Sequence, residues 1–147
     1  MSTFPSGHYA LFDATDTRRA GEFSFLKTPM FNYSTSYPEV CLSFKYYCYG
    51  YAVDSLWLLI DRKDGTGNDD MDYIWHTSYS QSDRWYNYSK TVNNFVGHIV
   101  FKGVRGHGVN GDLAVDDILI TEGSCDEAGW SIFSMSYNFV CSILVFL

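Results

Sequence analysis

The chain has 147 residues, a length that suits one domain with a hydrophobic core of its own. Apolar residues make up 46% of it, aromatic residues make up 18%, and there are only 3 prolines, so a disordered or low-complexity chain is excluded. The formal net charge is −7, and because an acidic surface repels phosphate groups, no nucleic-acid partner is expected.

Short segments with a two-residue hydrophobic period follow one another along the chain, and this period is typical of β-strands. In residues 41–46 the alternation places Leu42, Phe44 and Tyr46 on one face. The predicted strand 55–60 is continuously apolar from Leu56 to Ile60, as in a strand that is buried on both faces. No segment has the period and caps of an amphipathic helix, so we expect an all-β sandwich of antiparallel strands. The predicted strands are residues 9–13, 41–46, 55–60, 71–76, 85–92, 95–102 and 113–120.

Two glycine-bearing connections lie between predicted strands. Residues 61–70 are polar and carry oxygen donors, but they lack the glycine and glutamate positions of an EF-hand, so a solvated hairpin loop is expected. Residues 106–111 read G-x-G-x-x-G, the spacing of a dinucleotide-binding loop. That site needs a helix after the glycines, whereas a strand pattern follows here. We therefore interpret the glycines as a turn between strands.

The last part of the chain differs in composition from the rest. Residues 130–147 contain no charged side chain, and their length is at the lower limit for a membrane-spanning helix. Serine and asparagine dilute the first half of this segment, and no basic residue follows it. Three interpretations of the tail at 128–147 stay open: a truncated membrane segment, a buried strand, or sequence that is not part of the domain.

Sequence patterns of catalytic sites are absent, since there is no G-x-S-x-G, no H-E-x-x-H and no phosphate-binding loop with its lysine. We therefore expect no enzymatic activity. The histidines are far apart along the chain, and we interpret them as surface or strand residues. They are His8, His76, His98 and His107.

Asp116 and Asp117 are adjacent within the predicted strand 113–120. Neighbouring strand residues point to opposite faces, so the two carboxylates cannot line one cleft, and one of them must lie on the more apolar side. A carboxylate there needs a backbone amide, an arginine partner or a hard cation such as Ca²⁺. The residues alone leave these alternatives open.

The spacing of the cysteines does not match a zinc site. Cys48 lies on the same strand face as Leu42 and Phe44, so we expect a buried thiol, whereas Cys41 points to the other face. The four cysteines are Cys41, Cys48, Cys125 and Cys141.

Two tripeptides bear on the cellular compartment. Asn32 and Asn87 each begin an N-x-S sequence, the acceptor pattern of N-glycosylation. The amino terminus has no basic start and no apolar run, so secretion would require a leader that this sequence does not contain.

Several segments, taken in order, resemble the MAM domain, an extracellular module named for its occurrence in meprin and in receptor tyrosine phosphatase mu. Residues 41–50 match C-L-x-F-x-Y-x-x-Y-G, residues 101–106 match F-x-G-x-R-G, and residues 111–118 match G-D-I-A-I-D-D-I. The family's opening strand and its N-terminal cysteines are not found, so we expect residues 1–127 to be a MAM-like domain that lacks its opening strand. The other matching pieces are residues 7–14, 20–29 and 54–58, with Trp75, Trp85 and Cys125.

This resemblance implies a concanavalin-like jelly-roll β-sandwich with a role in cell-surface interaction and adhesion, without catalysis. It implies a disulfide between Cys41 and Cys125, which requires an oxidising compartment and agrees with the two glycosylation tripeptides. It also implies that Asp116 or Asp117 could hold a structural Ca²⁺ or another hard cation. The protein is expected to be extracellular, as part of a membrane-anchored parent, with a protein partner or self-association at the cell surface.

Two alternatives to a protein-interaction module stay open. The first is a carbohydrate-binding jelly roll, which would show an exposed row of aromatic side chains across a sheet. Tyr86 and Tyr88 are candidates for such a row, although packing between strands is their other interpretation. The second is a non-catalytic appendage of a secreted protease, because the module occurs beside proteolytic domains.

Overall fold

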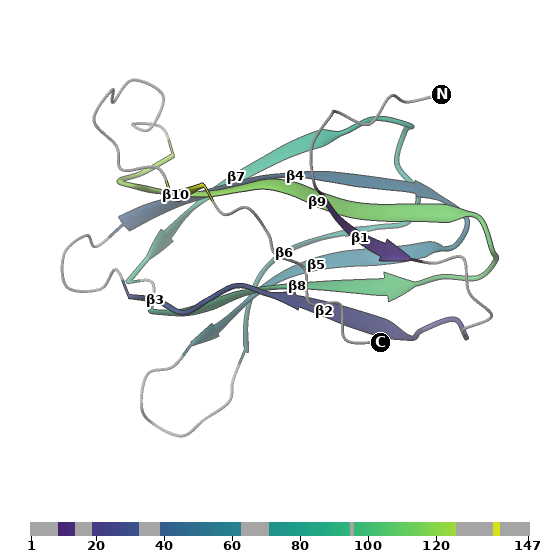
Figure 1. Cartoon of the computed structure of the whole chain (residues 1–147), viewed down its shortest axis with the longest axis horizontal. Helices are drawn as coiled ribbons and strands as arrows, with labels where there is room; N and C mark the ends of the chain where they lie inside the picture. Colours follow the sequence, from purple (N-terminus) through teal and green to yellow (C-terminus); the bar gives the residue numbers. More distant parts are fainter. Residues whose placement is uncertain are drawn as a thin grey trace.

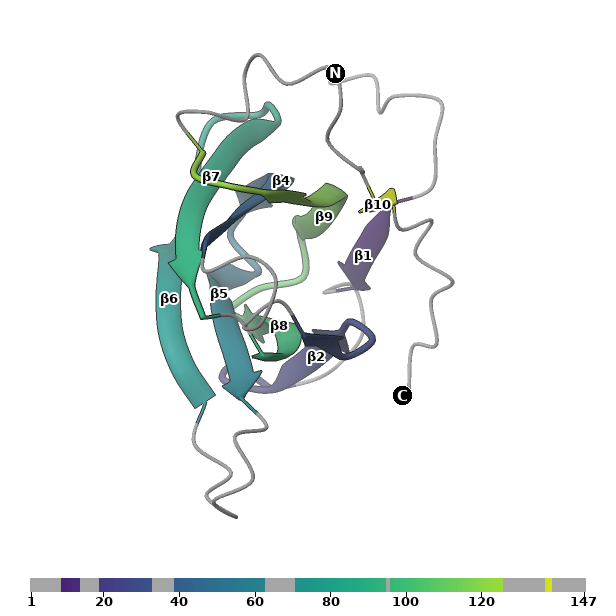
Figure 2. The ribbon, with the colours of Figure 1, turned by 90° about the vertical axis from the view of Figure 1, so that its left-hand side faces the viewer.

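A computed structural model of the chain describes residues 9–13, 19–32, 39–62, 71–94, 96–125 and 137–138, which form two antiparallel sheets. Sheet A has the order β1 (Ala10–Asp13), β9 (Gly111–Glu122), β4 (Glu39–Gly50) and β7 (Tyr86–Asn93), with β10 (Tyr137–Asn138) also paired to β9. Sheet B has the order β2 (Phe23–Lys27), β8 (Val96–Arg105), β5 (Val53–Arg62) and β6 (Met71–Ser78), with β3 (Phe31–Asn32) also paired to β8. Figures 1 and 2 show sheet A stacked above sheet B. The predicted all-β jelly-roll sandwich is confirmed.

All seven predicted strands are present, most of them with extended or shifted ends. The hydrophobic pattern did not predict β2, a short edge strand whose apolar residues lie on both faces. Phe23 and Phe25 are exposed on the outer face of sheet B, while Ser24 and Leu26 are partly buried. With Leu26 directly after Phe25, the segment lacks the regular two-residue alternation that marks a strand.

The core lies between the two sheets. Leu42 and Phe44 of β4 are buried in it as predicted, and Tyr46 packs at its margin. Phe44 and Phe101 meet edge to face at the centre, with ring centroids 4.9 Å apart, so the two sheets are joined by direct aromatic packing. The fully buried side chains also include Val40, Cys48, Leu56, Leu58, Ile60, Ile99, Val100 and Val115.

The burial of β5 differs from the prediction that residues 55–60 are buried on both faces. Leu56, Leu58 and Ile60 are fully buried, whereas Trp57 and Leu59 are partly exposed. The difference arises because a strand in an antiparallel two-layer sandwich covers the core with one face only. The apolar residues on its other face are therefore available at the surface.

Two connections between the sheets, β4 to β5 and β8 to β9, lie together at one end of the sandwich. The Ala52 amide donates a hydrogen bond to the Asn110 carbonyl (3.0 Å), and the Gly106 amide donates one to the Ala52 carbonyl (2.8 Å). The G-x-G-x-x-G segment is therefore a connection between two strands, as predicted, although those strands belong to different sheets.

β5 and β6 pair directly, which agrees with the predicted hairpin, but most of the connecting loop at 61–70 lies outside the described residues. The uncharged tail at 128–147 also lies outside them, apart from the backbone of Tyr137 and Asn138. Among the described residues, no helix has the length and apolar composition needed to cross a membrane.

Candidate interaction surface

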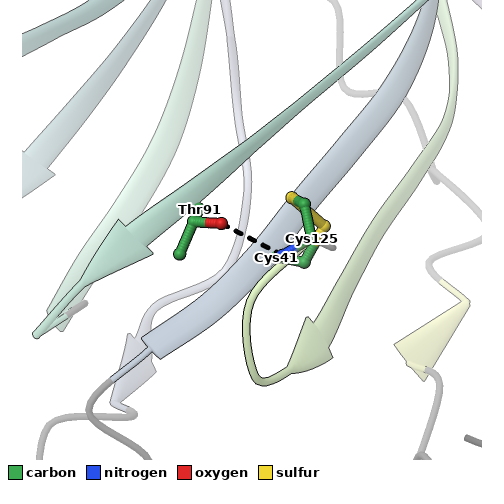
Figure 3. Close-up of a disulfide and its surroundings, with 3 residues drawn as sticks. All are labelled: Cys41, Thr91 and Cys125. Carbon is green, nitrogen blue, oxygen red and sulfur yellow. Dashed lines mark hydrogen bonds between the residues drawn. A yellow bond between two sulfur atoms is a disulfide. The ribbon is translucent and has the colours of Figure 1, made fainter. Parts of the chain in front are cut away.

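A disulfide joins Cys41 of β4 to Cys125, which follows the end of β9 (Figure 3). The two Cα atoms are 4.7 Å apart, and the amide of Cys125 donates a hydrogen bond to the hydroxyl oxygen of Thr91 on β7 (3.0 Å). The predicted pairing is confirmed. The bond links β4 to the segment that directly follows β9, its neighbour in sheet A.

Cys48 is a buried free thiol, as predicted, with no exposed surface. Its Sγ donates a hydrogen bond to the backbone carbonyl of Tyr79 (3.2 Å), and burial raises the pKa of the thiol to about 11. A protonated, enclosed thiol is a weak nucleophile, so this cysteine is a packing residue. Cys141 lies outside the described residues.

Asp116 and Asp117 lie at a β-bulge, and this position corrects the prediction that one of them faces the apolar side. Ser43 pairs with Leu119 but Lys45 pairs with Asp116, so β9 has one extra residue, and Asp117 adopts a φ of 48°. The bulge breaks the two-residue alternation, with the result that Asp116 is only partly buried and Asp117 is exposed.

Lys45 and Asp117 form an ion pair (2.7 Å) on the outer face of sheet A. The hydrogen bond to Asp117 and the charge of that carboxylate raise the pKa of Lys45, and the charge of Asp116 adds to the effect. Both partners are about half exposed, so the pair contributes at most about 1 kcal/mol to stability.

These carboxylates do not by themselves form a cation site, because Ca²⁺ takes roughly six to eight oxygen ligands. Asp116 accepts a hydrogen bond from the Asp117 amide (2.8 Å), and Asp117 is bound to an ammonium group. Across the described ranges, no three His, Cys, Asp or Glu side chains are grouped so that they could hold a metal. Cation binding at Asp116 or Asp117 stays a prediction.

The two predicted glycosylation positions are both exposed. Asn87 lies in β7 and alternates with the inward-facing Tyr86 and Tyr88, so its side chain is on the outer face of sheet A. Asn32 lies in β3, beside the first residue of β8. Modification of either position stays a prediction.

Tyr86 and Tyr88 do not form an exposed row. Tyr86 stacks on Tyr46 (5.4 Å between ring centroids), and Tyr88 packs on Phe44 and Trp75 (5.4 and 4.7 Å). These rings fill the margin between β7 of one sheet and β6 of the other. Packing between strands is therefore the correct interpretation of this pair.

An exposed aromatic row does occur, on the outer face of sheet B. We call it the sheet B surface, and it consists of Phe23, Phe25, Trp57, Tyr73, His76 and Lys102. The register aligns Phe25 with Lys102, Lys102 with Trp57, and Trp57 with His76, so the row crosses all four main strands of the sheet. Phe23, Phe25 and Tyr73 are about half exposed, at 56%, 49% and 54%.

Neighbouring groups hold the central ring of the sheet B surface in place. The Trp57 indole N–H donates a hydrogen bond to the Ser55 hydroxyl (2.8 Å), and the ring stacks on His76 (4.6 Å between centroids). Tyr73 meets Trp57 edge to face, and its hydroxyl shares a hydrogen bond of 2.6 Å with Nδ1 of His76. The row is therefore pre-organised.

Sequence reasoning did not find the sheet B surface. Tyr73 and His76 are three residues apart, and they lie on one face only because the register of β5 and β6 shifts between Leu58 and Leu59. The one available signal was the apolar run of the predicted strand 55–60, in which Trp57 lies between the core residues Leu56 and Leu58.

The other histidines do not gather into a catalytic group within the described ranges. His98 has its Nδ1 hydrogen-bonded to the Thr28 carbonyl (2.8 Å), and His107 is exposed in the connection between β8 and β9. His8 lies outside the described residues.

The fold, the disulfide and the exposed aromatic face define a class: an extracellular jelly-roll β-sandwich module. Comparison with known sequences identifies the family, because the sequence model of the MAM domain (meprin/A5/mu) matches residues 2–126. The chain belongs to the MAM family. Membership confirms the resemblance found in the sequence, and with the disulfide it confirms the predicted extracellular, cell-surface localisation.

Within the aligned region, the relatives are identical to the chain at about a third of the positions. The MAM domain-containing glycosylphosphatidylinositol anchor protein 1 of Rattus norvegicus is 32% identical over 126 residues, which cover 85% of this chain and 13% of that protein. The corresponding anchor protein 2 of Homo sapiens is 29% identical over 126 residues, covering 81% and 13%. The chain thus spans about an eighth of the length of these relatives.

A solved structure with a similar fold is the K3 cleaved adhesin domain of Lys-gingipain from Porphyromonas gingivalis. Its TM-score is 0.52 at 16% sequence identity, and the match covers 83% of this chain and 79% of that one. At this identity the likeness concerns the fold alone.

Proposed function

We propose that the chain is a non-catalytic module that binds a protein partner, or a second copy of itself, at the cell surface through the sheet B surface. The observation that carries this proposal is the aromatic row of Phe25, Trp57 and His76 across the sheet, with Phe23 and Tyr73 beside it. Aromatic side chains are enriched in the cores of protein interfaces, where a few residues carry most of the binding energy.

The rigidity of this row supports the same role. Binding normally loses free energy when mobile side chains become ordered, and this loss is small where side chains are already held in place. Trp57 is fixed by Ser55 and His76, and Phe23 lies under the ammonium of Lys102, 4.4 Å from the ring centroid. A partner would therefore meet a surface that needs little rearrangement.

The opposite face of the sandwich is less suitable for contact. A glycan on Asn87 would cover the outer face of sheet A, next to Lys45 and Ser89. Asn32 is paired with Val96, six residues before Lys102 along β8, so a glycan there would begin about 20 Å from the row. Glycosylation of Asn87 would thus leave the sheet B surface accessible, whereas a glycan on Asn32 would begin on the same face as the row, because the preceding Phe31 faces the core.

A carbohydrate-binding role is the second candidate, because it too calls for an aromatic row on a sheet. Sugar rings pack on the flat faces of aromatic rings. Here His76 stacks on one face of Trp57, and Lys102 lies over the ring of Phe23. These intramolecular contacts occupy ring faces that a sugar would need, so a protein partner is favoured.

Membrane attachment is proposed for the parent protein, on the grounds that the similar proteins are by name glycosylphosphatidylinositol anchor proteins. The chain would then be displayed outside the cell with the sheet B surface facing a neighbouring protein.

Beads coated with the full chain, applied to cultured cells that do or do not display the same chain, test the proposed function. We expect binding that is lost after the cells are treated with protease and survives removal of their glycans. Loss on glycan removal alone would favour the carbohydrate candidate. If the beads bind to none of the cells, both candidate functions are contradicted.

A further inference from the structure

An open hollow of about 530 Å³ lies at the end of the sandwich where the connections β4–β5, β6–β7 and β8–β9 meet. This volume is within the range of about 300–1,000 Å³ that is typical of ligand sites. The residues that line it include Tyr49, Tyr51, Ser80, Asn110 and Asp112. None of them belongs to the sheet B surface.

Hydrogen bonds fix the walls of the hollow. The Gly50 amide donates a hydrogen bond to the Ser80 hydroxyl (2.8 Å), which ties the β6–β7 connection to the end of β4. The Ala52 amide donates to the Asn110 carbonyl, which ties in the β8–β9 connection. The hollow is therefore formed before any ligand arrives.

The aromatic side chains of the hollow are available to a ligand. Tyr49 is 44% exposed and Tyr51 is 88% exposed. Both rings can therefore be reached by a ligand, and tyrosine is enriched among the residues that carry binding energy in protein contacts.

Asp112 gives the hollow a negative charge. It is paired in register with Tyr49, so the carboxylate and the phenol ring are neighbours on one face of sheet A. In the described part of the chain, Asp112 has neither an ion pair nor a hydrogen-bonded side-chain partner. The pKa of the adjacent Tyr47 is raised by burial and by its hydrogen bond to Asp83, and the charges of Asp83 and Asp112 raise it further.

We propose that this hollow binds the guanidinium group of an arginine side chain on a protein partner. A guanidinium is planar, so it stacks on tyrosine rings while its N–H groups donate to a carboxylate such as Asp112. The net charge of −7 favours the approach of a basic partner. The site is separate from the sheet B surface, so either can exist without the other.

Titration of the ¹⁵N-labelled full chain with N-acetyl-arginine N-methylamide, followed by NMR, tests the proposal. We expect saturable shifts of the Gly50, Gly111 and Asp112 amide signals, and no such shifts with the citrulline analogue, which has the same shape without the charge. Equal responses to the two compounds, or no saturable response to arginine, would overturn the proposal.

Two variants localise the site. Asp112→Asn should weaken arginine binding by at least about tenfold because it removes the charged acceptor, whereas Glu122→Gln, which removes one charge at the other end of β9, should not. Tyr51→Ala should also weaken binding, and because Tyr51 is exposed this variant should fold. Met30→Ala, which removes an exposed apolar side chain outside the hollow and outside the sheet B surface, is its control. Unchanged binding in Tyr51→Ala would contradict the site.

Discussion

Cys41 and Cys125 are joined across a sequence separation of 84 residues, and the bond links the β4 strand to the chain that leaves its neighbour β9. Cys41 pairs in register with Thr121 of β9 on one side and with Thr91 of β7 on the other. The bond is therefore attached to the middle one of three neighbouring strands of sheet A. A cross-link over so long a loop restricts the unfolded chain far more than it restricts the folded one.

Replacing both cysteines by alanine should therefore lower the free energy of unfolding by about 4–5 kcal/mol on the chain-entropy model. Guanidinium denaturation of the oxidised protein and of the variant measures this loss. Adding a reductant should destabilise the natural chain by a similar amount and leave the variant unchanged. A variant as stable as the oxidised chain would show that the disulfide does not stabilise the fold by restricting the unfolded chain.

Stability should also fall at alkaline pH, partly because of Cys48. The pKa of its thiol is raised from 9.0 to about 11, mainly by burial, so the folded chain holds this proton more tightly than the unfolded chain. The stabilisation is complete below pH 9.0 and is lost as the pH rises to about 11. The slope from this one group is at most about 1.4 kcal/mol per pH unit.

Denaturation midpoints measured from neutral to strongly alkaline pH test this prediction. Cys48→Ala should reduce the slope between pH 9.0 and about 11, although it lowers stability at every pH by leaving a small cavity. Burial also raises the pKa of Tyr47 above its ordinary value of 10.0, so Tyr47→Phe should reduce the loss of stability that begins above pH 10.0. An identical pH profile for Cys48→Ala and the natural chain would be inconsistent with a buried, protonated thiol.

Two glycines with positive φ should respond differently to substitution by alanine. A Cβ at Gly50 would lie 2.5 Å from the Gly111 Cα and 2.6 Å from the Asn110 carbonyl oxygen, whereas a Cβ at Gly21 would meet nothing within 4 Å. Gly21→Ala should cost about 1–2 kcal/mol for its backbone conformation alone. Gly50→Ala should cost a further 1–3 kcal/mol or so, because backbone atoms must move. Equal losses in thermal unfolding would argue against the close approach of the two connections.

Secretion from a eukaryotic host should place a glycan on Asn87 or Asn32, since both side chains are exposed. Mass spectrometry before and after enzymatic removal of N-glycans identifies the modified residue, and Asn87→Gln with Asn32→Gln serves as the unmodified control. Secreted protein with neither residue modified would remove the glycan argument for the sheet B surface.

The sequence was sufficient for the fold because its strongest strands obey the two-residue period. Leu42 and Phe44 alternate toward the core, and Cys48 continues the same face. The disulfide was different: strand alternation set Cys41 apart from Cys48, but only the family resemblance indicated Cys125 as its partner. The two-residue period thus predicted the strands and their buried faces, and the family resemblance predicted the disulfide.

The surfaces could not be predicted in the same way, because they depend on register. A bulge turns Asp117 away from the apolar side, and a second register shift brings Tyr73 and His76 to one face. The hollow near Tyr51 combines three connections that are distant in the sequence. Periodicity within a strand describes which residues share a face only while the ladder is regular.

The most direct test of the account is the binding of bead-coupled variants to the cells that bind the natural chain. Phe25→Ser with Tyr73→Ser changes two half-exposed residues of the sheet B surface, and Leu11→Ser changes a similarly exposed residue of β1 in sheet A. We predict that the first variant loses at least about tenfold in binding while Leu11→Ser keeps it. Full binding by the Phe25 and Tyr73 variant, with its fold intact, would contradict the assignment of the contact surface to sheet B.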